Sequence, residues 1–266
     1  MSSDRLRTQL HFENILSGGN PTTWQSLTKG QIKSFELTPT HVTIFESALL
    51  DDSIDFYYKG ILSLNEGIIS SKHKNFSWAT VKLYYATYYF LRASLCCKKI
   101  AFVRKERDGY HFNNIALDKP KANGMPDHMA AIDLFRQHFI TTDFLQSNTI
   151  NAMNPYEWLR QQRENVNYRH RTFFEPDISA IWDSISTEFD NDGMEFWIKK
   201  YIDDDIYSFL DDHAVLALPI RRLMLTHTDI KTAGYTTIVR ADKLVKINSL
   251  IASDDYLKLL RPFYHA

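Results

Sequence analysis

The stretch WATVKLYYATYYFLRASLCC, which runs from Trp78 to Cys97, decides the fold of this chain. It is long enough for about five helical turns at roughly 3.6 residues per turn. One stripe of residues recurs at alternating spacings of four and three: Ala79, Leu83, Ala86, Phe90, Ala93 and Cys97. The small side chains in this stripe predict that a second helix approaches closely there.

Most of the remaining positions in the stretch are also apolar or aromatic, so a helix here is expected to be buried on nearly all sides. Its only charged residues are Lys82 and Arg92. These charges and the four tyrosines argue against a membrane span, although about 20 residues would suffice for one. We interpret the stretch as the central helix of the core.

The composition suits one large domain, or a domain with an appendage. The chain has 266 residues, of which 44% are hydrophobic. A formal net charge of −1 and a pI near 6.8 give no overall attraction to nucleic acid or acidic membranes, so any nucleic-acid contact requires a local patch. The only cysteines, Cys96 and Cys97, are adjacent and provide neither a disulfide framework nor a four-ligand zinc site.

The sequence predicts a cytoplasmic protein without a cofactor or metal. The first residues, MSSDRLRTQLHF, lack the apolar run of a signal peptide. The chain contains no Gly-rich phosphate loop, GxSxG elbow, HExxH or CxxC motif. The aspartates at 203–205 and 211–212 are better explained as solvated helix caps than as ligands of a hard cation.

The predicted fold class is all-α, in three parts. An N-terminal extension covers residues 1–40, an antiparallel helical bundle covers 41–176, and a mainly helical region covers 177–266. Within the bundle, Asp51-Asp52-Ser53 predicts a break or cap between two helices, and Ser77 is expected to cap the central helix. Residues 98–126 are interpreted as a basic run followed by a long loop.

Two further helices have clear local signals. The apolar period over residues 127–140 predicts a helix whose buried face is Ala131, Ile132, Phe135 and Phe139. The motif Asn154-Pro-Tyr-Glu157 is typical of a helix start, and this helix is expected to continue to residue 170 and to stop by Pro176. Residues 232–239 have the β-branched character of a short strand or hairpin.

The helix expected from Pro155 carries a dense group of basic and polar residues. On one α-helical face, at spacings of three, four and three, lie Arg160, Arg163, Asn167 and His170, and Arg169 and Arg171 flank His170. Such a cluster suits a phosphate, because Arg donates two parallel hydrogen bonds and His exchanges a proton near neutral pH. The structural alternative is a solvated face whose arginines pair with Glu157 and Glu164.

The order of these segments resembles the HEPN superfamily of small helical bundles, common in bacterial toxin–antitoxin and antiphage systems. The resemblance rests on the aromatic helix SWATVKLYYATYYFLRASL, the helix HMAAIDLFRQHFI and the motif RENVNYRH, over roughly residues 51–176. Members that cleave RNA carry an Arg, four to six residues and then a His, and two protomers form one composite cleft. The resemblance implies that the Arg holds the scissile phosphate and the His assists attack by the ribose 2′-hydroxyl, without a metal.

Arg163 and His170 match this pattern, so they are the candidate catalytic residues. Around them are the candidate nucleic-acid contacts Arg160, Asn167, Arg169 and Arg171. The spacing alone has little specificity, because it also occurs at Arg5–His11, Arg104–His111 and Arg221 or Arg222–His227. The chain also departs from the nuclease pattern: a carboxylate, Glu164, follows the Arg, and Arg163 with Tyr168 resembles the Arg-x4-Tyr form of members not thought to cleave RNA.

Two hypotheses follow from these residues and the resemblance. The first is a metal-independent endoribonuclease or RNA-binding effector that acts as a homodimer in a bacterial defence or stress system. The second is a non-catalytic helical adaptor that binds a partner ATPase, nuclease or antitoxin. A geometric criterion separates them: whether Arg163 and His170 face a second protomer across a basic cleft or pack against their own chain.

Overall fold

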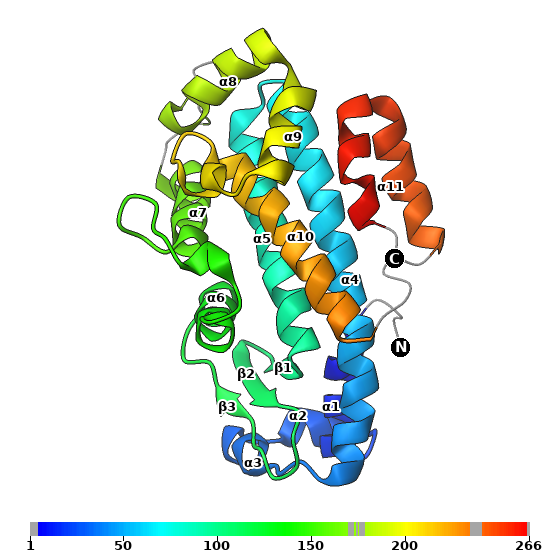
Figure 1. Ribbon diagram of the computed structural model, residues 1–266. Coiled ribbons are helices and arrows are strands. Elements are labelled where there is room, and N and C mark those ends of the chain that lie inside the picture. The colour runs from blue at the N-terminus through cyan, green and yellow to red at the C-terminus, as the bar shows by residue number, and fades with distance from the viewer. Residues whose placement is uncertain (1–4, 170–172, 174, 176–178, 235–240, 265–266) are drawn as a thin grey trace.

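A pair of long antiparallel helices forms the centre of the molecule. The computed structural model describes residues 5–169, 173, 175, 179–234 and 241–264. The central pair is α4 (Pro39–Lys72) and α5 (Phe76–Cys97), and α10 (Ala214–Thr232) crosses both (Figure 1). The predicted central helix is therefore confirmed, and all of its small-residue stripe is buried except the half-buried Cys97.

Two glycines let α4 and α5 approach closely. A Cβ atom on Gly60 would lie 2.4 Å from Cε1 of Phe90, and one on Gly67 would lie 2.8 Å from Cγ of Leu83. Leu83 and Phe90 both belong to the stripe of α5 that predicted such an approach, and both are fully buried. The expectation of a close helix–helix contact is thus confirmed, with the glycines supplied by the opposite helix.

The break predicted at Asp51-Asp52-Ser53 is wrong, because α4 is continuous through these residues. Asp52 is buried and accepts hydrogen bonds from the backbone N–H groups of Arg7 and Thr8 at 2.7 and 3.0 Å. The Arg7 side chain pairs with Asp51 at 2.9 Å. These carboxylates hold the start of α1 (Arg7–Ser17), where a negative charge is favourable, rather than ending α4.

The cap expected from Ser77 is also replaced by a tertiary contact. Helix α5 begins at Phe76, and the Glu175 carboxylate accepts hydrogen bonds from both the N–H and the hydroxyl of Ser77, each at 2.7 Å. Hydrogen bonds from Ser77 lower the pKa of Glu175 although partial burial opposes this shift. A side chain 98 residues away in sequence thus fulfils the capping role.

The segment interpreted as a basic run and loop contains a small antiparallel sheet. Its strands are β1 (Ile100–Lys105), β2 (Asp108–Asn113) and β3 (Lys121–Ala122), in the order β1-β2-β3. The described chain is mostly helical, which agrees with the predicted all-α class, and this small sheet is a part of it that the sequence did not predict. The sheet lies at the end of the central pair where α4 begins, beside α1, α2 (Pro21–Ser26) and α3 (Lys29–Ser34) (Figure 1).

The other helices surround the central pair, as Figure 1 shows. Their bounds are α6 (Asp127–Phe139), α7 (Pro155–Glu164), α8 (Ala180–Asp192), α9 (Met194–Asp203) and α11 (Ala241–Ser253), with 3₁₀ turns at Phe144–Gln146, Ile206–Phe209 and Asp255–Phe263. The predicted buried face of α6 is confirmed. The strand predicted at 232–239 is not formed in its first three residues, because residue 232 ends α10 and residues 233–234 form a turn. Residues 235–239 lie outside the described residues, as does Pro176, the predicted stop of the helix that begins at Pro155.

Candidate functional site

Helix α7 presents the candidate arginines because its start is well defined. Asn154 accepts a hydrogen bond from the Tyr156 N–H at 3.1 Å, and Pro155 occupies the first turn, as its sequence predicted. Tyr156, Trp158 and Leu159 are buried. Arg160 and Arg163 follow Tyr156 at spacings of four and seven, so they lie on the same side of α7 as this buried tyrosine, and both are half-buried.

Arg160 is neutralised within its own helix. Its Nε lies 2.7 Å from Oε2 of Glu157, and its Nη1 contacts the carboxylate of Glu164. This arrangement matches the alternative in which the arginine pairs with neighbouring glutamates. An incoming phosphate would have to displace two carboxylates, so Arg160 is poorly placed for a first contact.

Arg163 packs on tyrosines of the central helix instead. Its Nη2 donates a hydrogen bond of 3.1 Å to the hydroxyl of Tyr85. Its Cζ lies 5.4 Å from the ring centroid of Tyr84 and 5.6 Å from that of Tyr85, within the range of a cation–π contact. By the criterion stated above, Arg163 packs against its own chain.

The imidazole that this cluster contains belongs to His128, at the start of α6. Its Nδ1 lies 3.1 Å from the Tyr84 hydroxyl, and its ring centroid lies 4.3 Å from that of Tyr88. Partial burial and then the positive charge of Arg163 lower the pKa of His128, so its neutral form predominates at pH 7. Sequence reasoning missed His128: the tyrosines of α5 were interpreted as core, and nothing local in the sequence links α6 to α7.

The regular helix expected through residue 170 is wrong beyond Glu164. Residues Asn165–Arg169 form a π-helical turn, so the α-helical spacing that placed Asn167 on one face with Arg160 and Arg163 does not continue past Glu164. Asn167 is half-buried on this turn. The side chain of Arg169, together with His170 and Arg171, lies outside the described residues, so these three assignments stay predictions.

A basic groove of 800 Å³ adjoins the cluster at His128 and Tyr88. Its cations come from α3, β1 and the β1–β2 turn: Lys29, Lys33, Arg104 and Arg107. Lys29 pairs with Asp108 at 2.8 Å and Arg104 pairs with Asp127 at 3.2 Å. Lys33 and Arg107 are exposed and form no ion pair within the described part of the chain, so the groove carries a local positive excess.

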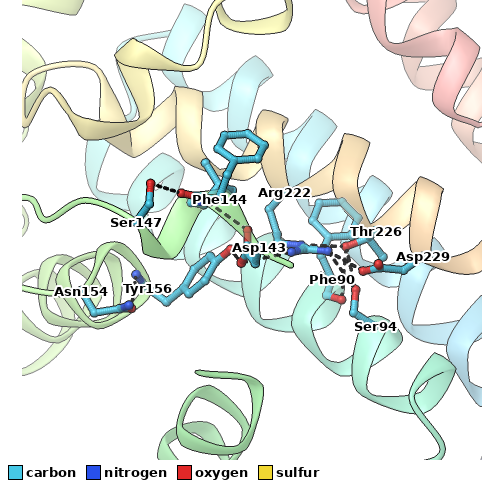
Figure 2. Close-up of polar contacts among 11 residues, drawn as sticks. Phe90, Ser94, Asp143, Phe144, Ser147, Asn154, Tyr156, Arg222, Thr226 and Asp229 are labelled. Atoms are coloured by element: carbon cyan, nitrogen blue, oxygen red, sulfur yellow. Dashed lines mark hydrogen bonds and ion pairs between the residues drawn. The ribbon is translucent and has the colours of Figure 1, made fainter. Parts of the chain in front are cut away.

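A second charged cluster is buried and serves the fold. Arg222 on α10 is 1% exposed; it lies 3.3 Å from Asp143 and 2.7 Å from Asp229, and it donates a hydrogen bond of 3.0 Å to Ser94 (Figure 2). Asp143 also accepts a hydrogen bond from the Tyr156 hydroxyl. The Arg–His spacing at Arg222 and His227 therefore does not mark a phosphate site, since Arg222 is enclosed in this network.

Metal and thiol chemistry have no obvious location in the described residues. No group of three or more His, Cys, Asp or Glu side chains there is arranged to hold a metal ion. Burial raises the pKa of the Cys97 thiol to about 12, so this cysteine is unreactive at neutral pH. None of the described helices is both long and apolar enough to cross a membrane.

The candidate site is therefore the cluster of Arg163, His128, Tyr84, Tyr85 and Tyr88, with the basic groove beside it. It combines a guanidinium, a neutral imidazole and several aromatic rings. Comparison of the chain with protein-family profiles, with curated protein sequences and with solved structures found no match.

Proposed function

We propose that this chain is a HEPN-like, RNA-contacting protein of a bacterial defence or stress system. The observation that supports this function best is the meeting of Arg163 with His128 over the tyrosines of α5, beside a basic groove. The groove cations attract the phosphate backbone, and the tyrosine rings offer faces on which bases can stack. Because the overall charge is −1, RNA would have to be recruited by a local patch, and the groove provides one.

Cleavage is the stronger form of the proposal. Two protomers would pair so that Arg163 and His170 of each face one cleft. Arg163 would bind the non-bridging oxygens of the scissile phosphate. His170 would take the proton of the 2′-hydroxyl, whose oxygen attacks phosphorus while the bond to the 5′-oxygen breaks. The leaving 5′-oxygen takes a proton from water, which gives a cyclic phosphate and a free 5′-hydroxyl end. This chemistry uses an internal nucleophile and requires no metal.

The adaptor function is the second candidate, and two observations favour it. Arg160 is neutralised by Glu157 and Glu164. In addition, Trp78 is 51% exposed and Phe173 is 42% exposed, and their ring centroids lie 5.3 Å apart. Exposed aromatic pairs of this kind are typical anchors of protein–protein contacts.

The test is to incubate the purified protein with total RNA in EDTA and to follow both cleavage and binding. Cleavage by the wild type that falls roughly 10²-fold or more in His170→Ala, and is mostly lost in Arg163→Lys, would support the nuclease. Binding without cleavage would leave an RNA-binding effector. Lys199→Ala, an exposed change on α9, is the control and should behave as the wild type.

The adaptor function predicts a different set of results. RNA would remain intact and unbound, Arg163→Lys would retain function, and function would be lost in Trp78→Ser. That combination would contradict any RNA contact at this face.

A further inference from the structure

A second cavity, of 480 Å³, lies among α1, α2, α4, α5 and β1. It is separate from the basic groove, although Tyr88, Arg104 and Asp127 line both. Its walls combine charged side chains with aromatic rings, and the rings come from four elements: Trp24, Phe56, Tyr88, Tyr89 and Phe102. The rings favour a guest with a flat apolar part, and the charged side chains favour one that also carries a polar group.

A buried cation lines this cavity. Arg92 of α5 is 6% exposed, and its Cζ lies 4.3 Å from the ring centroid of Phe102 and 4.6 Å from that of Phe56. Its Nη1 donates a hydrogen bond of 3.1 Å to the Tyr88 hydroxyl, whereas its Nε is buried without a hydrogen-bond partner. Within the described residues Arg92 forms no ion pair.

The other cations that line the cavity already have carboxylate partners, and Glu106 adds a further carboxylate at its edge. Arg5 pairs with Glu13, and Arg104 pairs with Asp127 at 3.2 Å. Arg92 is thus the one lining cation in the described chain without a carboxylate partner. The Tyr88 hydroxyl, the rings of Phe56 and Phe102 and the charge of Asp127 favour the cationic form of Arg92, but in the described residues no carboxylate lies within ion-pair distance of its guanidinium. An anion that entered the cavity would supply what Arg92 lacks.

We propose that this cavity binds a small molecule in which one anionic group, a carboxylate or a phosphate, is joined to a flat apolar body. The anionic group contacts the Arg92 guanidinium, whose planar donors match either group. The body lies along the rings of Trp24 and Tyr89. This inference goes beyond RNA contact and does not depend on it, since no residue of the α7 helix lines the cavity.

The experiment measures binding by titration calorimetry and by thermal shift, with pairs of probes that differ in charge. The carboxylate arm compares indole-3-acetate with the neutral indole-3-acetamide, and the phosphate arm compares adenosine 5′-monophosphate with adenosine. Acetate tests the anion without a body. We expect at least one charged probe to bind at least about tenfold more tightly than its neutral counterpart and than acetate.

Variants locate the binding. Arg92→Met removes the charge while keeping an unbranched apolar chain between Phe56 and Phe102, so we expect it to fold and to lose binding at least about tenfold. Lys82→Met removes a charge from the same helix away from the cavity and should bind as the wild type. Leu6→Trp fills part of the cavity and leaves Arg92 in place. We expect it to weaken binding, and it tests the site independently if Arg92→Met fails to fold.

Several results would overturn the proposal. These are equal affinity for charged and neutral probes, unchanged affinity in Arg92→Met or in Leu6→Trp, or no binding of any probe at millimolar concentration. In the last case the cavity holds water alone.

Discussion

At the scale of the residue, two basic side chains share one cluster, and their charges oppose each other. Arg163 is always charged, and its charge, after partial burial, lowers the pKa of His128. His128 is therefore neutral when the cluster is empty at pH 7. A bound phosphate would reverse this effect, because an anion favours the imidazolium form.

This opposition predicts a pH dependence of RNA binding. Affinity should rise as the pH falls below about 6.5, because His128 then gains a proton that phosphate stabilises. His128→Gln should remove the rise and keep the pH 7 affinity, whereas Arg163→Lys should weaken binding roughly tenfold at every pH. Filter-binding titrations at fixed salt check this, and an identical pH profile in His128→Gln would contradict it.

Stability should depend on pH in the opposite direction. Burial is the leading cause that lowers the pKa of His128, His138 and His227. The unfolded chain therefore binds more protons than the folded one as the pH falls through and below about 6.5, so the free energy of unfolding should decrease. Urea unfolding at pH 7.5 and pH 5.5 measures this, and greater stability at the lower pH would contradict it for these groups.

At the scale of the element, the contact between α4 and α5 depends on glycine. Gly60→Ala would gain about 1 kcal/mol of helix propensity, but its Cβ would meet the ring of the fully buried Phe90 at 2.4 Å. Overpacking costs about 1–3 kcal/mol, so we expect net destabilisation of up to about 2 kcal/mol. Ala86→Leu on the facing helix should cost about 1–3 kcal/mol for the same reason.

Gly30→Ala is the matched control for this prediction. Gly30 lies in α3, and the nearest atom to an added Cβ is Oγ1 of Thr28 at 3.8 Å. The propensity gain is then unopposed, so this change should be neutral or slightly stabilising. Chemical denaturation compares the three variants, and full tolerance of both Gly60→Ala and Ala86→Leu would contradict the close packing.

The ionic network at Arg222 joins α10 to α5 and to the segment before α7. Arg222→Met would leave Asp143 buried without its cation, which should cost about 3–5 kcal/mol. Adding Asp143→Asn to Arg222→Met should recover part of the lost stability, because the second change removes the unpaired carboxylate. Thermal unfolding of the single and double variants checks this, and equal stability of the two would contradict the pairing.

At the scale of the whole molecule, the proposed composite site requires two protomers. A twofold homodimer is the commonest assembly of this kind. We expect light scattering at micromolar concentration to give about twice the monomer mass of 31.1 kDa. A monomer that still binds RNA would rule out the composite cleft while leaving a single-chain RNA contact, and Trp78→Ser tests whether the exposed aromatic pair lies in the interface.

The sequence alone determined the elements whose signals are local. The period of small and apolar residues predicted α5, the same kind of period predicted the buried face of α6, and Asn154 with Pro155 predicted the start of α7. These signals suffice because helix periodicity and capping act over a few residues.

The tertiary structure decided what depends on distant partners. Asp51 and Asp52 suggested a break, yet they hold α1 about 45 residues away. Arg163 and Tyr85 are 78 residues apart in sequence, and Tyr84 and His128 are 44 residues apart, so no local sequence pattern predicts their contacts. Packing alone brings such side chains together, because the free energy of burying apolar faces depends on the whole fold rather than on neighbours in sequence.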